Sequence, residues 1–319
     1  MSKKLLAAAL LPTAAFAQSS LPANDTMVVT ANRVEQPVSA VLAPVVVIDR
    51  AEIESRQVSS LTDLLKTLPG VQITTLGGRG HMSSLFIRGT NSNHSLVLMN
   101  GRPIAAMVAG TPDLSQIPLG NIERVEYIRG PRAAVYGSDA IGGVINLITK
   151  TSAKSGSETH LKGGAGSHGY GQGQLRTVQA LGQQTDMNLL VGYERTDGFD
   201  VVAGAQQPDR DGFDSLNGQV GMNHAFNDAW SADFNAQGYD NQTEMDDAYQ
   251  SADQSRVKAF QYDGGLKFQS ETLTSRLEAS YGENKLKSWL ESQGESSAQP
   301  IHTGLTRFSW INSWSGVEG

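Results

Sequence analysis

Residues 230–237 read WSADFNAQ, a stretch in which hydrophobic and polar side chains alternate without interruption. Successive side chains of a β-strand point to opposite faces, so this period of two predicts a strand with one apolar and one polar face. Residues 216–223 and 273–281 repeat the pattern. An antiparallel sheet in a soluble sandwich would show the same alternation. The pattern therefore predicts antiparallel strands and leaves the kind of sheet open.

The connections between these strands alternate in length. The short ones are residues 182–186, 227–228 and 270–272, and the long polar ones are residues 195–215, 240–258 and 282–304. In a meander every second connection lies at the same end, so the long loops gather on one side. Amphipathic strands with short turns at one end and long loops at the other are typical of outer-membrane barrels. We therefore predict about eight barrel strands after residue 156 rather than a sandwich.

Residues 38–150 follow a different pattern, in which short helices and strands are mixed. The stretch APVVVID (43–49) predicts a strand, and Asp49 with Glu52 predicts a capped helix after it. Ser60 with Asp63 predicts the start of a second helix, which Pro69-Gly70 ends. The leucines of this second helix fall on one face. Three further strands are predicted around Asn/Gly turns, so this region is a compact α+β domain.

The N-terminal region contains two signals. Residues 1–17 (MSKKLLAAALLPTAAFA) combine two lysines, an apolar run and an A-x-A site, which predicts a cleaved secretory signal. Residues 25–33 (DTMVVTANR) are β-prone but isolated, and no turn signal after them predicts a partner strand in this chain. A strand close to a mobile terminus is suited to joining the sheet edge of another protein.

The composition excludes several classes of function. The chain has 25 basic and 32 acidic residues, a net charge of −7 and no basic stripe, which argues against a nucleic-acid partner. It has no cysteine, and after residue 17 it has no apolar run long enough for a transmembrane helix. The six histidines are scattered, and no pairing of nucleophile and base stands out. We therefore predict no catalytic residues and no enzyme.

Three motifs follow one another in the α+β region: LPGVQI (68–73), LFIRGT (85–90) and IRGPRAAVYGSDAIGGVINLITK (128–150). They resemble motifs of one family, the TonB-dependent outer-membrane transporters. Within the family, DTMVVTANRVEQP (25–37), DLSQIP (113–118), GFDVVA (198–203) and DAWS (228–231) are most similar to members that import cobalamin (vitamin B12). A siderophore or haem importer is the near alternative, and a secreted β-rich binding or adhesion protein is the more remote one.

The resemblance implies an α+β plug domain followed by antiparallel transmembrane β-barrel strands, about 8 of an expected 22. It divides the chain into a signal peptide (1–17), a TonB box with an N-terminal arm (18–36), the plug (37–155) and the N-terminal part of the barrel (156–319). The chain would be an N-terminal fragment of a protein of the Gram-negative outer membrane, in contact with its lipid. The periplasmic protein TonB would drive import of a corrinoid such as cobalamin.

The resemblance also implies binding residues. The TonB box comprises Asp25, Thr26, Met27, Val28, Val29, Thr30 and Ala31, which would add as a strand to the sheet of TonB. The candidates for ligand binding in the plug loops are Met82, Ser84, Asn91, Val108 and Ala109. Val108 and Ala109 are the weaker candidates, because their loop departs from the family pattern and is one residue shorter.

Two of the long loops are acidic, and packed carboxylates repel one another unless solvent or a cation neutralises them. The candidate metal ligands are Asp200, Gln207, Asp209, Asp211, Asp246, Asp247 and Asp253. All of them offer oxygen, and several carboxylates around one site suit calcium better than magnesium. The positions match the calcium-binding loops of the family, although the residues there leave open whether Asp246 or Asp247 is the ligand. A merely solvated acidic loop is the alternative.

Overall fold

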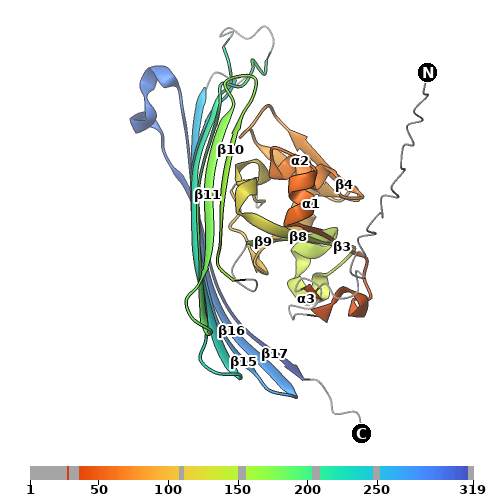
Figure 1. The fold of residues 1–319 in the computed structure, drawn as a ribbon. Helices are drawn as coiled ribbons and strands as arrows, with labels where there is room; N and C mark the ends of the chain where they lie inside the picture. Colours follow the sequence, from red (N-terminus) through yellow and green to blue (C-terminus); the bar gives the residue numbers. More distant parts are fainter. Residues whose placement is uncertain are drawn as a thin grey trace, which may run out of the picture.

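The computed structural model describes residues 27–28, 36–107, 111–149, 156–202, 209–246 and 252–314. They form a small α+β domain, here called the plug, and a tall curved sheet of eight strands, here called the barrel sheet. The plug lies against the concave face of the barrel sheet (Figure 1). Among the described residues no helix is both long and apolar enough to cross a membrane.

The barrel sheet is an antiparallel meander, as predicted. In chain order its strands are β10 (Glu158–Ala165), β11 (Gly171–Ala180), β12 (Thr185–Thr196), β13 (Phe213–Ala225), β14 (Trp230–Glu244), β15 (Gln254–Gln269), β16 (Leu273–Trp289) and β17 (Ile301–Trp314). Each strand pairs with the next in the sequence. Within the described residues β10 and β17 do not pair with each other, so the sheet is open at both edges.

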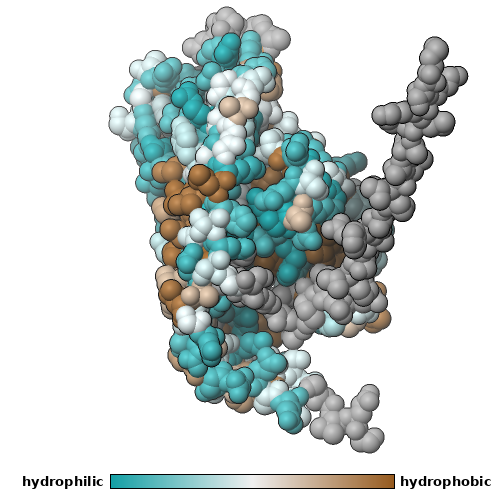
Figure 2. Space-filling view, in the orientation of Figure 1, coloured by the Kyte–Doolittle hydropathy of each residue, from teal (hydrophilic) through white to brown (hydrophobic). Residues whose placement is uncertain are grey.

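The two faces of the barrel sheet have opposite polarity. On the convex face large apolar side chains are exposed, among them Val220, Met222 and Phe234. On the concave face polar side chains such as Gln219 and Asn235 are buried. Hydrophobic residues gather at middle height along the outer side of the sheet, with hydrophilic residues toward both ends (Figure 2). This distribution is the reverse of a soluble protein and fits a sheet with lipid outside and the plug inside.

The strands extend further into the long loops than the sequence pattern predicts. The loop predicted at 282–304 is confined to residues 290–300, because β16 continues its pairing with β15 as far as Trp289. Two 3-10 turns, η7 (Glu291–Gln293) and η8 (Glu295–Ser297), fill the shortened loop. The other two long connections shorten to residues 197–212 and 245–253.

The plug is built on a five-stranded mixed sheet with the order β3-β8-β9-β6-β7, in which only β6 and β9 are parallel. A separate hairpin joins β4 to β5. The strands are β3 (Val45–Asp49), β4 (Val71–Thr75), β5 (Ser83–Ile87), β6 (Ser95–Met99), β7 (Arg102–Pro103), β8 (Ile122–Arg129) and β9 (Gly143–Thr149). The helices are α1 (Arg50–Ser55), α2 (Leu61–Lys66) and α3 (Ala133–Tyr136). The 3-10 turns are η2 (Val38–Ala40), η3 (Ser92–His94), η4 (Leu114–Gln116), η5 (Leu119–Asn121) and η6 (Ser138–Ala140).

The two predicted helix starts are confirmed at atomic level. The Asp49 side chain accepts a hydrogen bond from the Glu52 backbone N–H at 2.9 Å, and Ser60 Oγ accepts one from the Asp63 N–H at 3.1 Å. The leucine face of α2 packs into the plug core, where Leu64 and Leu65 are fully buried. Local capping and one apolar face therefore account for both helices.

The N-terminal arm departs from the prediction. A two-residue strand, β1 (Met27–Val28), pairs antiparallel with β2 (Gln36–Pro37) of the same chain. The prediction that no partner strand follows in this chain was therefore wrong. The remaining residues of the predicted TonB box, the signal peptide and residues 150–155 lie outside the described residues.

Candidate functional site

The candidate site lies where the plug meets the long-loop end of the barrel sheet. There the plug loop that joins β4 to β5 lies against the ends of β12, β13 and β14. Arg79 in this loop forms a bidentate ion pair with Glu194 of β12, with N–O distances of 2.7 and 3.0 Å. Its guanidinium also lies 5.1 Å from the centre of the Phe213 ring. Sequence reasoning missed Arg79, because its partners lie far away in the chain.

Gly80 allows the loop to approach the barrel wall closely. Its φ of +78° lies in the left-handed region, and a Cβ there would stand 2.2 Å from the Phe213 ring. Its carbonyl oxygen accepts hydrogen bonds from the side chains of Gln116 and Thr243. The next residue, His81, is buried beside the backbone of Gly78 and Arg79. Desolvation lowers the pKa of His81, which keeps the imidazole neutral at pH 7.

The predicted ligand residues of the plug divide into two places. Met82, 46% exposed, and the half-buried Ser84 lie at the start of β5. Asn91 is exposed but follows the far end of β5, after a turn closed by the Thr90 N–H and the Ile87 carbonyl at 3.1 Å. Val108 and Ala109 lie outside the described residues. The structure therefore places Met82 and Ser84 together and Asn91 apart from them.

Asp113 fixes the start of β5. Its Oδ1 accepts hydrogen bonds from the backbone and hydroxyl of Ser83, at 3.0 and 2.7 Å, and from those of Ser115, at 3.1 and 2.8 Å. Burial raises the pKa of Asp113, although these hydrogen bonds act in the opposite direction. This contact holds the strand that carries Met82 and Ser84 against η4, and the sequence alone did not indicate it.

Three of the predicted metal ligands lie together on two loops of the barrel sheet. One carboxylate oxygen from each of Asp200, Asp211 and Asp246 lies within 4.8 Å of the other two. Asp200 and Asp211 come from the loop after β12, and Asp246 comes from the loop after β14. Asp211 accepts a hydrogen bond from the Val201 N–H at 2.8 Å, and Asp246 accepts one from the Val202 N–H at 3.1 Å.

The charges of this cluster are poorly compensated. Asp211 is 3% exposed, and one carboxylate oxygen of Asp200 is buried without a hydrogen-bond partner. Desolvation, aided by the charges of Asp246, Asp209 and Asp200, raises the pKa of Asp211 to about 6. A cation among the three oxygens would neutralise this repulsion.

The remaining predicted metal ligands are placed differently. Asp209 is exposed and lies outside the group of three, although its charge contributes to the raised pKa of Asp211. Asp253 also lies outside it, and its carboxylate accepts a hydrogen bond from the Glu291 N–H at 2.6 Å. Gln207 and Asp247 fall outside the described residues. Of the pair Asp246 and Asp247, only Asp246 is among the described residues, and it belongs to the cluster.

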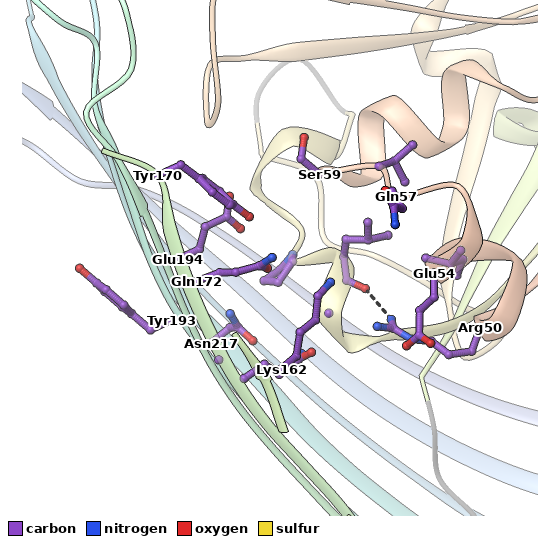
Figure 3. A pocket seen from close by; sticks show the side chains of 18 residues that line it. Arg50, Glu54, Gln57, Ser59, Lys162, Tyr170, Gln172, Tyr193, Glu194 and Asn217 are labelled. Carbon is purple, nitrogen blue, oxygen red and sulfur yellow. Dashed lines mark hydrogen bonds and ion pairs between the residues drawn. The ribbon is translucent and has the colours of Figure 1, made fainter. Parts of the chain in front are cut away.

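A polar seam runs between plug helix α1 and the concave face of β10–β13. Arg50, Glu54 and Gln57 face it from the plug, and Lys162 and Gln172 face it from the sheet (Figure 3). Arg50 is held by Glu54 at 2.8 Å and by the Ile122 carbonyl at 3.0 Å. Tyr193 points away from the plug (Figure 3), in keeping with the alternation along β12. The two bodies therefore meet through polar side chains in this region.

Comparison with known proteins gives the fold. Residues 37–144 match the family model described as the TonB-dependent receptor plug domain. The ferric yersiniabactin uptake receptor FyuA from Yersinia pestis superposes with a TM-score of 0.72 at 18% identity, covering 88% of this chain and 47% of that one. The siderophore receptor PiuA from Acinetobacter baumannii gives 0.70 at 17%, covering 89% and 44%. The siderophore receptor PirA from the same organism gives 0.66 at 20%, covering 83% and 44%.

The chain thus spans less than half the length of these solved structures. The fold is a plug domain followed by eight antiparallel strands that match part of a TonB-dependent receptor barrel. The family whose model matches is a receptor family and not an enzyme family.

Proposed function

We propose that this chain is the plug and the first barrel strands of a TonB-dependent receptor, which imports a large metal-containing ligand across the outer membrane. The observation that carries the proposal is the placement of a plug on the polar concave face of a sheet whose convex face is apolar. In lipid every backbone group needs an internal partner, and a closed barrel provides one. The plug would then block the barrel interior until it is displaced.

The ligand has two candidates within this class. The solved structures named above are receptors for siderophores, which favours a ferric siderophore. The sequence motifs favour cobalamin. In either case Met82 would offer an apolar contact and Ser84 a hydroxyl contact to the ligand at the long-loop end of the barrel, which we call the outer mouth. Asn91 would contact the ligand from a separate position. Many shallow contacts hold such a large ligand, so each substitution should cost on the order of 1 kcal/mol of binding free energy.

The ligand test is direct competition in outer membranes that contain the complete receptor. Cyanocobalamin and a panel of ferric siderophores are titrated separately against the parent and against a Met82→Ala, Ser84→Ala variant. Saturable binding of a siderophore, weakened in the variant, supports the siderophore candidate. Saturable binding of cyanocobalamin alone supports the corrinoid. If neither cyanocobalamin nor any of the siderophores binds, the proposal that the receptor imports such a ligand is overturned.

Coupling to TonB is proposed at residues 25–31. Val28 is the test position, because proline there removes a backbone donor and disfavours extended pairing. Val28→Pro should abolish uptake and leave surface binding of the ligand intact, whereas the conservative Val28→Ile should transport normally. Uptake by the proline variant at the parental rate would refute strand addition at this segment.

A calcium site is proposed at Asp200, Asp211 and Asp246, with Asp209 close by. Oxygens bound to one calcium ion at 2.3–2.6 Å lie within about 5 Å of each other, so the three carboxylates suit one ion. The unpartnered buried oxygen of Asp200 gives the fit a second support. When bound, calcium would supply the positive charge that orders the two loops at the outer mouth. The residues of this chain would hold it by carboxylate oxygen alone.

The calcium proposal is tested by calorimetric titration of calcium chloride into the purified receptor, with magnesium chloride as the comparison. We expect calcium binding that Asp211→Asn and Asp246→Asn each weaken severely, while Asp253→Asn has little effect because Asp253 caps Glu291 instead. No heat of calcium binding, or an equal loss in Asp253→Asn, would exclude this set of ligands.

Export to the outer membrane through a cleaved signal is the last part of the proposal. Cleavage after Ala17 would leave Gln18 as the first residue. Mass spectrometry of the receptor from outer-membrane fractions should detect this terminus. A receptor that retains residues 1–17 would contradict the proposal.

A further inference from the structure

One arginine of the plug enters the barrel wall far from the candidate site. Arg102 begins β7, at the edge of the plug sheet, directly after a turn in which Asn100 and Gly101 have φ of +51° and +80°. The turn is fixed to β9, because Asn100 exchanges hydrogen bonds with Thr149 at 2.9 and 3.0 Å. The Gly101 N–H also donates to Asn146 at 2.9 Å. Arg102 therefore projects from a rigid hairpin rather than from a flexible loop.

The Arg102 guanidinium is surrounded by acidic residues of three barrel strands. Asp233 of β14, Asp263 of β15 and Glu278 of β16 lie 3.7, 3.8 and 3.7 Å from its terminal nitrogens. Arg102 Nη2 also donates a hydrogen bond to the Gly264 carbonyl oxygen at 3.4 Å. Arg102 is 3% exposed, and the Asp263 side chain is fully buried. We call these three carboxylates the acidic socket.

The strand register creates the socket. Asp233 pairs with Gly265, which in turn pairs with Glu278, so the two carboxylates flank a glycine on one ladder row. A Cβ on Gly265 would stand 2.6 Å from the Asp233 carboxylate, so a side chain there would crowd the socket. The socket is thus a feature of the barrel wall itself, and the plug supplies what enters it.

The excess of negative charge in the socket is smaller when the plug is present. Arg276 of the barrel lies 2.8 Å from Asp233 and 2.7 Å from Glu278. With Arg102 in place, two cations face three carboxylates, and without it one cation faces the same three. Removing one partner of a buried ion pair leaves an uncompensated charge, which is strongly unfavourable. Among the described residues, two other ion pairs join the plug to the barrel sheet, Arg79–Glu194 and Glu123–Arg176. Each of them pairs one cation with one carboxylate.

We propose that Arg102 and the acidic socket form the seat of the plug on the barrel wall, and that this seat is a positioning contact that opens when the plug is displaced. The consequence for transport rests on the proposed function, but the seating itself does not. The partner that the socket recognises is a single guanidinium of the same chain. Displacement exposes a surplus of negative charge on the barrel wall, which favours return of the plug.

These 319 residues contain no cysteine, so a cysteine introduced at the seat is the only one among them. Ala105 is buried close to the seat, where its carbonyl accepts a hydrogen bond from Asn284 of β16 at 2.7 Å. The cysteine in Ala105→Cys, in a receptor whose other cysteines, if any, are replaced by serine, reports on the seat through its reaction with a membrane-impermeant maleimide, in membranes without ligand or energy source. The background is combined with Arg102→Met, Asp263→Asn, both together, or Arg56→Gln. Arg56 is the matched control, since its carboxylate partner Glu52 lies within the plug.

We expect Arg102→Met to label at least about tenfold faster than the parent, because an unpaired buried charge shifts such an equilibrium strongly. The double variant should label close to the parental rate, since it restores the parental excess of one carboxylate over the cations, and Arg56→Gln should label like the parent. Parental labelling of Arg102→Met would overturn the proposal. Equally fast labelling of the single and double variants would assign Arg102 to packing and overturn it as well. If Arg102→Met does not assemble, Arg102→Gln, which also removes the charge, gives the same comparison when tested alone and together with Asp263→Asn.

This measurement does not depend on uptake. A receptor that transports neither corrinoid nor siderophore but labels as expected refutes the proposed function and keeps the seat. A receptor that transports normally but labels alike in every variant refutes the seat alone.

Discussion

Asp211 is the residue at which the two acidic loops meet, and its raised pKa gives a pH dependence. In the metal-free protein the folded state holds a proton on Asp211 up to a pKa of about 6, well above the usual 3.8. The folded state therefore binds more protons than the unfolded state between these values, and its stability falls as pH rises through them. Calcium binds the deprotonated carboxylate, so its affinity depends on pH in the opposite sense.

We predict that calcium affinity is constant above pH 7 and about tenfold weaker at pH 5, where a group with a pKa of about 6 is mostly protonated. Calorimetric titrations at half-unit intervals of pH measure this. In Asp211→Asn the affinity should be low and nearly independent of pH. A flat profile in the parent would show that Asp211 does not contact the ion.

Gly198 tests the same cluster without removing a carboxylate. Its φ is +65°, and a Cβ there would stand 1.8 Å from the backbone carbonyl oxygen of Asp211. We predict that Gly198→Ala displaces the loop and weakens calcium binding about tenfold or more, as expected for backbone strain of a few kcal/mol. Gly173→Ala is the control, because a Cβ at Gly173 meets no atom within 4 Å. Equal calcium affinity in both variants would contradict the geometry of this loop.

Sequence reasoning at the residue scale succeeded where partners are close in the chain. The caps at Asp49 and Ser60 involve residues three positions apart. The group of Asp200, Asp211 and Asp246 was anticipated from acidic loops, but its separation from Asp253 was not. Arg79, Asp113 and Arg102 were missed because each has a partner that lies 30 or more residues away along the chain. No local pattern marks such contacts.

At the scale of elements the strands were predictable and their lengths were not. The alternation of apolar and polar residues predicted the two faces of each strand. The length of a strand depends instead on how far the neighbouring strand provides hydrogen-bond partners, and β15 provides them to β16 as far as Trp289. The short ladder of β1 with β2 was missed for a different reason. It is only two residues long, and its second strand includes Pro37, a residue that sequence rules exclude from most strands.

The polarity of the strand faces gives a prediction for the barrel sheet. Val220 lies near the middle of β13 on the convex face, whereas Met187 lies near the short-turn end of β12 on the same face. Val220→Lys should destabilise the receptor in lipid by about 2–4 kcal/mol, and Met187→Lys by less, because Met187 lies two ladder rows closer to the short-turn end. Urea unfolding in liposomes measures both. Equal costs would show that the lipid boundary does not cross β13 at Val220.

At the scale of the whole molecule, plug and barrel sheet meet closely enough to be joined covalently. A Cβ built on Gly282 of β16 lies 3.5 Å from the Cβ of Ala105 in the plug, a separation found in disulfides. We predict that Ala105→Cys with Gly282→Cys forms a disulfide under oxidising conditions and stops uptake, and that a reductant restores it. Each single cysteine variant should transport at the parental rate. Uptake by the oxidised double variant would mean that the ligand passes without movement of this side of the plug.

The overall architecture could be predicted because period-two strands, alternating loop lengths and several plug motifs all indicate the same fold. The ligand could not be predicted in the same way. Its contacts depend on a few loop side chains such as Met82 and Ser84, and different ligands use the same scaffold. The position of the plug against one wall of the sheet also depends on pairs such as Arg79–Glu194, which only the folded chain reveals.

The ladder between β1 and β2 has a mechanical consequence under the proposed coupling to TonB. Because the two strands are antiparallel neighbours, tension on the chain ahead of Met27 and resistance beyond Pro37 act at the same end of the pair. Such a load peels the pair one hydrogen bond at a time instead of shearing all of them together. The pull then reaches β3, an edge strand held by β8 alone. The β1–β2 ladder therefore breaks first and at low force. The pulling force then acts on the plug sheet at its edge strand, β3, before it reaches the inner strands.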